Sequence, residues 1–153
     1  MKTKKKKPIS ISTLRNKLWS ITSEYVRYAA ADYNGYVACV TCGVIKFWQG
    51  DGMQCGHWIP KARGNATAWD LRNLNPQCSK CNVLLGSNGP EYYPYMLATY
   101  GQAVVDELRQ LCGASVKLTR TDYLEMIDER AGLLADLVMS RKRGCDIPRL
   151  DIK

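Results

Sequence analysis

The sequence predicts a mixed α+β fold, in which helices at both ends of the chain flank a small centre held together by a metal ion. Three observations lead to this prediction. Apolar residues recur at helical spacing before residue 35 and after residue 91, the stretch between them lacks that periodicity, and two Cys-x-x-Cys pairs lie within it. The 153 residues have the length of one domain.

The chain begins with a basic tail and a helix. Residues 1–9 form the tail, which we expect to be disordered because its first seven residues include five lysines. Residues 10–35 predict a helix, because four apolar residues recur at steps of four, three and four: Leu14, Leu18, Ile21 and Tyr25. Asn34-Gly35 ends this segment in a turn.

The two remaining segments differ in composition. Residues 36–90 are rich in glycine, cysteine, asparagine and tryptophan, which favours short strands and loops stapled by zinc. Residues 91–153 return to a helical pattern within the same compact domain, with one helix over 91–111 interrupted near Gly101 and another over 121–142. We expect the last helix to bury five apolar residues: Leu124, Ile127, Leu134, Leu137 and Val138.

The net charge of +8 is concentrated at the ends of the chain. Residues 1–7 contribute +5 and residues 141–153 contribute +3, so residues 8–140 are neutral overall. Within that neutral part, residues 46–80 carry a local charge of +3. This distribution favours nucleic acid as the partner, with a basic tail that tethers the protein to phosphates.

Composition and hydropathy exclude several classes. The apolar and charged fractions of 46% and 24% are those of a globular protein, not of a disordered chain, a coiled coil or a collagen. No apolar run approaches the ~18 residues that a membrane span needs. The lysines at the amino terminus are not followed by an apolar segment, which argues against a signal peptide and for a cytoplasmic protein.

The cysteine pairs predict a structural zinc site. Cys39 and Cys42 form one pair, Cys78 and Cys81 form the other, and 35 residues separate them. Each pair can place two thiolates on one ion from a tight turn, and two pairs complete a tetrahedral site. A redox role would need only one pair and a thioredoxin-like βαβ context, which the sequence lacks.

The one histidine of the chain, His57, lies between these pairs and next to Gly56. A lone histidine is often only a packed or solvated residue, and that remains the alternative here. Because four cysteines already serve zinc, the imidazole of His57 is free to take a proton from water, as phosphodiester hydrolysis requires. The scissile phosphate would then need an oxygen-preferring cation such as Mg²⁺.

The surrounding motifs resemble a known family. A histidine between two Cys-x-x-Cys pairs, Asn-Leu before the second pair and Asn directly after it resemble the HNH or His-Me finger nucleases. More narrowly, four runs are similar to the phage NinG (Rap) recombination proteins: Gln-Cys-Gly-His-Trp-Ile-Pro, Asn-Ala-Thr-Ala-Trp-Asp, Asn-x-x-Pro-Gln-Cys-x-x-Cys-Asn and Tyr-Gly-Gln-Ala-Val-Val-Asp-Glu-Leu. The resemblance covers about residues 36–110, without the lysine tail or the last helix.

The resemblance implies a ββα-metal core and a role for each matching residue. His57 corresponds to the general base, Asn73 to the asparagine that holds the histidine loop, and Asn82 to a ligand of the catalytic divalent metal, Mg²⁺ or Mn²⁺. The cysteines correspond to the zinc ligands that join the two halves of the core: Cys39, Cys42, Cys78 and Cys81.

One position departs from the pattern. Many HNH enzymes have an aspartate directly before the histidine as the second metal ligand, whereas this chain has Gly56, as related NinG-like sequences also tend to have. Asp51, Asp70 and Asn75 are the candidates for that ligand. The alternative for each is turn or capping chemistry.

Basic and aromatic residues of this region are candidates for contacts with DNA. Lys61, Arg63, Arg72 and Lys80 could bind phosphates, with Arg63 the first choice because a guanidinium binds phosphate through two parallel hydrogen bonds. Solvated surface is the alternative for each of them. Trp48, Trp58 and Trp69 could stack on unpaired bases, although core packing is the commoner role.

We therefore expect an HNH-type endodeoxyribonuclease that acts on branched recombination intermediates, such as Holliday junctions or D-loops, in phage recombination in the host cytoplasm. The partners expected are DNA, a second copy of the chain and other recombination proteins, without a membrane. Two alternatives are a zinc-held DNA-binding adaptor without catalysis and a protein-interaction module in a recombination complex.

Overall fold

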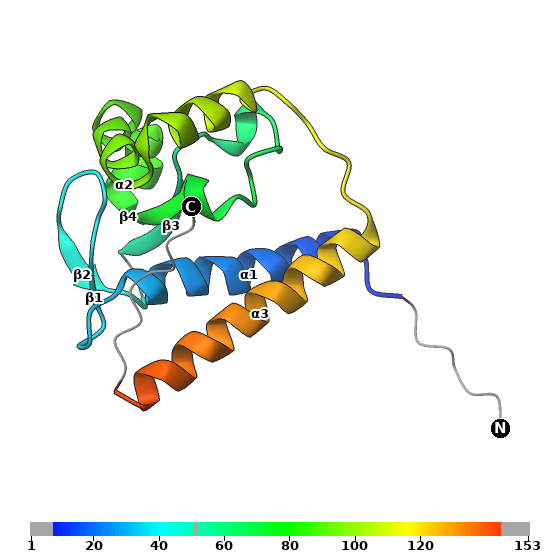
Figure 1. The fold of residues 1–153 in the computed structure, drawn as a ribbon, viewed down its shortest axis with the longest axis horizontal. Helices are drawn as coiled ribbons and strands as arrows, with labels where there is room; N and C mark the ends of the chain where they lie inside the picture. The colour runs from blue at the N-terminus through cyan, green and yellow to red at the C-terminus, as the bar shows by residue number, and fades with distance from the viewer. Residues whose placement is uncertain (1–7, 51, 145–153) are drawn as a thin grey trace.

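The computed structural model describes residues 8–50 and 52–144 of the chain. Within them, long helices and two small antiparallel sheets give the mixed α+β architecture that the sequence predicts (Figure 1). The elements are α1 (Ile11–Ala30), β1 (Tyr36–Ala38), β2 (Ile45–Phe47), β3 (Met53–His57), β4 (Leu74–Cys78), α2 (Gly89–Gln110) and α3 (Arg120–Lys142). Short helical turns lie at Lys61–Arg63, Leu71–Asn73, Lys80–Leu84 and Gly86–Asn88.

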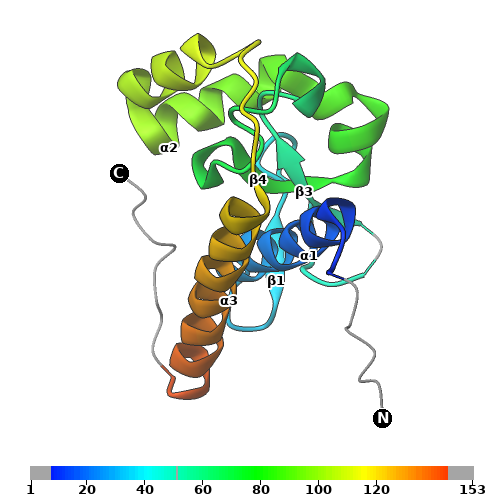
Figure 2. The same cartoon turned by 90° about the vertical axis from the view of Figure 1, so that its right-hand side faces the viewer.

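The centre of the fold is the hairpin of β3 and β4. Their register pairs Met53 with Cys78 at one end and His57 with Leu74 at the other. Because side chains alternate along a strand, Cys55 and Leu74 face one way and Gly56 and Asn75 the other. The first face packs on α1 and α3 and the second meets α2, so the hairpin lies between two helical layers (Figures 1 and 2).

Helix α1 begins at a capping residue and buries the expected stripe. The Ser10 hydroxyl accepts a hydrogen bond from the Thr13 amide, which satisfies one free N–H at the helix start. Leu14, Leu18 and Tyr25 are buried as their spacing predicts. The third predicted position differs, because Ile21 is only partly covered and its neighbour Thr22 is buried instead.

Helix α3, the last described helix, packs along α1, the first described helix. Thr119 and Asp122 form a capping box at its start, and Ile127 and Leu137 are buried as expected. The expectation for Leu124 was wrong: it is 47% exposed, and its neighbour Tyr123 is buried against α1 instead. The apolar stripe of α3 therefore begins one residue earlier than expected, and Leu134 and Val138, which were also expected to be buried, are only partly covered.

Helix α2 is interrupted at Gly101, as the sequence predicts. Gly101 has φ 79° and ψ 169°, a conformation that only glycine adopts without strain, and it divides α2 into two helical halves. None of the described helices combines the length and the apolar character needed to span a bilayer. The lysines of residues 2–7, together with Asp51 and residues 145–153, lie outside the described residues.

Candidate functional site

The two Cys-x-x-Cys pairs meet at one end of the hairpin. Cys39 and Cys42 lie in the turn after β1, whereas Cys78 ends β4 and Cys81 lies in the Lys80–Leu84 turn. The four Sγ atoms lie within 4.8 Å of one another, and those of Cys42 and Cys78 are 3.7 Å apart. Zn–S bonds of ~2.3 Å at a tetrahedral ion would separate the sulfurs by about 3.8 Å. The predicted cluster is confirmed as one that could hold a metal such as zinc.

Two thiols of the cluster have pKa values shifted in opposite directions. The backbone of Val44 lowers the pKa of Cys42, but burial and hydrogen bonds with the other three cysteines outweigh it and raise this pKa to about 12. Burial raises the pKa of the Cys39 thiol, but hydrogen bonds from the Thr41 side chain and from neighbouring backbone groups outweigh burial and lower this pKa from 9.0 to about 6. The Thr41 hydroxyl oxygen lies 3.1 Å from Cys39 Sγ. Cys39 is thereby favoured as a thiolate, which is the form that binds zinc.

His57 lies at the opposite end of β3 and is held from two sides. It is 7% exposed. Its ring stacks on Trp19 of α1, with centroids 5.2 Å apart and planes inclined by 16°. Its Nε2 lies 3.1 Å from the carbonyl oxygen of Ala68, in the loop that joins β3 to β4.

The Ala68 contact determines the tautomer of His57. A carbonyl oxygen can only accept a hydrogen bond, so Nε2 carries the hydrogen and Nδ1 keeps its lone pair in the neutral ring. Burial lowers the pKa of His57 and the nearby Lys61 charge lowers it further, whereas the bond to Ala68 opposes them, so that the pKa falls from 6.5 to about 4. His57 is therefore neutral at neutral pH, with a lone pair on Nδ1.

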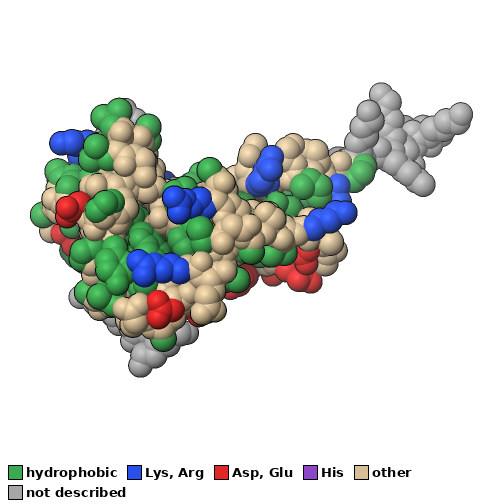
Figure 3. Space-filling model, turned by 90° about the horizontal axis from the view of Figure 1, so that it is seen from above, with side chains coloured by type: hydrophobic (Ala, Val, Ile, Leu, Met, Phe, Trp, Pro, Cys, Tyr) green, Lys and Arg blue, Asp and Glu red, His purple; other side chains and the backbone are tan. Residues whose placement is uncertain are grey.

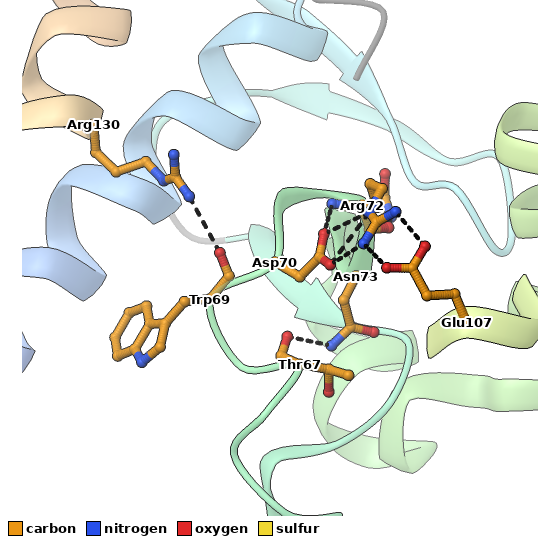
Figure 4. Close-up of polar contacts among 8 residues, drawn as sticks. Thr67, Trp69, Asp70, Arg72, Asn73, Glu107 and Arg130 are labelled. Atoms are coloured by element: carbon orange, nitrogen blue, oxygen red, sulfur yellow. Dashed lines mark hydrogen bonds and ion pairs between the residues drawn. The ribbon is translucent and has the colours of Figure 1, made fainter. Parts of the chain in front are cut away.

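Asn73 fastens the loop that holds His57. It is fully buried; its Oδ1 accepts from the Ile59 amide at 2.8 Å, and its Nδ2 donates to the carbonyls of Ile59 and Thr67 at 3.1 and 3.0 Å (the Thr67 bond is drawn in Figure 4). Thr67 precedes Ala68, so one amide braces both arms of the loop. This is the kind of contact that the HNH resemblance implies for Asn73, whose part in catalysis stays a prediction.

Lys61 lies near Trp19 and His57, whereas Lys80 lies near the cysteine cluster. The Lys61 ammonium lies over the ring of Trp19, with Nζ 3.8 Å from its centroid, so it neighbours the indole on which His57 stacks. Lys80 is exposed at the start of the turn that carries Cys81. On the face seen from above, Lys and Arg side chains are spread among hydrophobic and neutral ones and form no single basic patch (Figure 3).

Arg72 is engaged within the protein. Its guanidinium donates to Asp70 at 2.7 Å and to Glu107 of α2 at 2.8 and 2.9 Å, and these bonds raise the pKa of Arg72 (Figure 4). Asp70 also caps the Leu71–Asn73 turn. In this conformation Arg72 ties the loop to α2, and its predicted contact with phosphate would have to replace these ion pairs.

Asn82 is not brought next to His57. Its Nδ2 donates to Gln54 Oε1 at 2.7 Å. Gln54 lies three residues before His57 in β3, about 10 Å along the strand, and points to the opposite face. The contact orients the Asn82 amide, and its service as a metal ligand stays a prediction.

Position 56, directly before His57, leaves room only for glycine. A Cβ on Gly56 would overlap Oε1 of Gln77 and lie 2.8 Å from its Cδ. The Gln77 side chain is fully buried, and its Nε2 donates to the Ser87 carbonyl at 2.8 Å. Gln77 therefore fills the space in which a side chain at position 56 would begin.

The candidates for a second metal ligand have other contacts. Asp70 is paired with Arg72 as described. Asn75 is fully buried, and its Oδ1 accepts hydrogen bonds from the hydroxyls of Tyr95 and Tyr100. Asp51 lies outside the described residues. The contacts of Asp70 and Asn75 are those of capping and packing, which was the alternative considered for both.

A comparison with protein families gives a match over residues 1–139, to the family described as bacteriophage lambda NinG protein. The chain belongs to the NinG family. No curated protein and no solved structure matches it. The NinG match is longer than the resemblance over residues 36–110: it includes the lysine tail and most of α3, which corrects the expectation that these parts stand outside it.

Two residues of this NinG-family site were missed by sequence reasoning. Trp19 stacks on His57 from a helix that ends well before the cysteine pairs, and no local pattern links the two. Gln77 lies inside the NinG-like run itself, directly before Cys78. Its position two residues after Asn75 on a strand would have placed it on the face of Gly56, had the register been known.

Proposed function

We propose that this NinG-family chain is a metal-dependent endonuclease that cuts branched DNA intermediates of recombination. The observation that carries the proposal is the state of His57: a neutral imidazole whose Nε2–H is bonded to Ala68 and whose Nδ1 bears a lone pair. Membership of the NinG family supports phage recombination as the setting. A second copy of the chain and other recombination proteins are proposed as further partners.

The residues of the chain would act as follows. Nδ1 of His57 takes a proton from a water molecule as that water attacks phosphorus, and the bond from phosphorus to the leaving oxygen breaks. Trp19 and the carbonyl of Ala68 keep the ring in place during this transfer. Burial and the nearby Lys61 charge both disfavour the imidazolium, so the ring releases the proton to solvent water after the transfer.

The proposal involves two metal ions, one with a structural role and one with a catalytic role. Zinc would be held by the cysteine cluster and would join the β1–β2 turn to the end of β4. Mg²⁺ or Mn²⁺, when bound, would polarise the phosphate and stabilise the leaving oxygen. Among the described residues, the cysteines are the group of three or more His, Cys, Asp or Glu side chains that could share an ion. Asn82 alone is a poor magnesium site, so such an ion would depend on phosphate oxygens of the DNA.

A cleavage assay tests the proposal. Supercoiled and four-way-junction DNA are incubated with the protein and Mg²⁺, Mn²⁺ or chelator. His57→Ala should lower the cleavage rate about 10²-fold or more, while zinc content and DNA affinity stay unchanged. Lys117→Ala, at an exposed residue between α2 and α3, is the control. Equal rates for wild type and His57→Ala would refute the proposal.

A second candidate is a zinc-held DNA-binding adaptor without catalysis. It is favoured by Gly56, whose missing side chain is replaced by the buried Gln77, and by the burial of His57 beneath Trp19. The same assay separates the two. If neither protein cleaves but both shift DNA, the adaptor is correct, and if neither shifts DNA, the chain is a protein-interaction module.

A further inference from the structure

A cavity lies between the loop after β3, the turn before α2 and the end of α2. It measures about 300 Å³, the lower end of the range for small-ligand sites. Its walls include Trp58 and Arg63 from the loop, Arg109 from the end of α2, and Ser87 and Gly89 from the turn before α2. Trp58 directly follows His57 in the chain, but it packs with α2, whereas His57 packs on α1 and does not line the cavity.

The cavity is positively charged. Arg63 and Arg109 both line it, and no acidic residue does. Neither guanidinium takes part in an ion pair within the described residues, in contrast to Arg72, whose guanidinium is shared by two carboxylates. Two such guanidinium groups in one small cavity favour an anion, and phosphate is the anion that arginine binds through parallel hydrogen bonds.

The cavity also presents an aromatic wall and a fixed turn. Trp58 stacks near Tyr93, and the Arg109 guanidinium carbon lies 4.7 Å from the Tyr93 ring centroid and 5.7 Å from that of Trp58. Ser87 has a left-handed φ of 73°, and its carbonyl is held by the buried Gln77. Aromatic and guanidinium planes are the surfaces on which proteins stack nucleobases.

We propose that this cavity binds one unpaired nucleotide, a base with its phosphate, of the DNA substrate. The inference rests on the proposed function, since it takes DNA as the substrate. A cavity of this size admits one base and excludes a base pair within a duplex. Unpaired nucleotides occur where strands exchange at a branch, so the cavity would select branched DNA over intact duplex.

A binding experiment tests this. The probes are a duplex with one unpaired 2-aminopurine nucleotide, the fully paired duplex of the same sequence and free 2-aminopurine deoxynucleoside monophosphate. Binding is followed by 2-aminopurine fluorescence, without divalent metal so that no cleavage occurs. The variants are Arg63→Gln, Arg109→Gln and Gly89→Leu, with Arg120→Gln as a control for the lost charge, and thermal unfolding verifies their folding.

Gly89→Leu is a blocking variant that leaves the charge intact. A Cβ at Gly89 would meet open space, and the backbone there is helical, so the larger side chain should enter the cavity without disturbing the fold. Each arginine variant should weaken binding of the unpaired probe about tenfold, the loss of a hydrogen bond to a charged group. Gly89→Leu should do the same, whereas Arg120→Gln should not.

The outcomes decide the inference independently of the proposed function. Equal affinity of the wild type for paired and unpaired probes, or unchanged binding by all three variants, would overturn it. Free monophosphate bound as tightly as the unpaired duplex would overturn the assignment to a DNA strand. Cleavage of the same DNA with Mg²⁺ is measured separately, so failure to cleave would refute the nuclease while the binding result stands on its own.

Discussion

The pairing of Gly56 with Gln77 makes a sharp prediction about stability. Gly56→Ala places a Cβ into the Gln77 side chain, which is fully buried and cannot swing into solvent. Overpacking of this kind costs about 1–3 kcal/mol, and loss of the Gln77 hydrogen bond to Ser87 adds about 1 kcal/mol. We expect Gly56→Ala to lower the free energy of unfolding by about 3 kcal/mol.

A double-mutant cycle isolates the contact. The free energy of unfolding in urea, with zinc in excess, is measured for Gly56→Ala, Gln77→Ala and the double variant. Since shortening Gln77 removes the overlap, the double variant should be more stable than the sum of the single effects implies, by about 1–3 kcal/mol. Gly132→Ala, where an added Cβ in α3 meets open space, is the matched control and should raise stability by up to about 1 kcal/mol.

Additive losses in this cycle would refute the reasoning, because they would mean that Gly56 and Gln77 do not compete for one volume. So would a Gly56→Ala protein as stable as the wild type. The result bears on mechanism, since it decides whether an aspartate could ever be introduced before His57 without first removing Gln77.

Three further predictions follow from the site. The pKa of His57 is about 4 in the folded protein and 6.5 in the unfolded chain, so between pH 6.5 and 4 mainly the unfolded chain takes up this proton. The free energy of unfolding of the wild type should therefore fall by about 3 kcal/mol more than that of His57→Gln between pH 7 and 4. Parallel stability curves for the two proteins would contradict this. Asn73→Ala leaves buried backbone groups of Ile59 and Thr67 unpaired and should cost about 3 kcal/mol in urea unfolding, more than Asn65→Ala at an exposed loop residue. Elemental analysis should find one zinc per chain, and its removal by a strong chelator should lower the melting temperature by ten degrees or more, as a rough expectation for a small metal-stapled centre; an unchanged melting temperature would exclude a structural ion.

Local patterns predicted the parts of the fold that depend on neighbours in sequence. The stripe of Leu14, Leu18 and Tyr25 follows from helical spacing, and the break at Gly101 from the one residue that tolerates its backbone angles. The approach of the two cysteine pairs follows from their shared need for one ion. In each case the chemistry of the residues restricts the structure strongly, whatever the rest of the chain does.

Contacts between segments that are distant in sequence could not be predicted from the sequence. No local sequence pattern indicates that Trp19 covers His57 or that Glu107 pairs with Arg72. Both contacts depend on how α1 and α2 pack on the hairpin. Arg72 and Arg63 are equally basic in sequence, yet one is neutralised and the other lines a cavity without acidic groups. The function of a charge in this protein is decided by the partner that the fold supplies.

The contact between α1 and α3 has a consequence for how the protein matures. Trp19 is supplied by the first helix, and α3, the last described helix, packs along that helix; Arg141 donates to the carbonyl of Ala31 at 2.6 Å, joining residues 110 positions apart. Contacts so distant in sequence form late, because the intervening chain must first be synthesised and its loop closed. A nascent chain from which α3 has not yet emerged lacks these contacts, so the surroundings of His57 would reach their final packing only after α3 has left the ribosome.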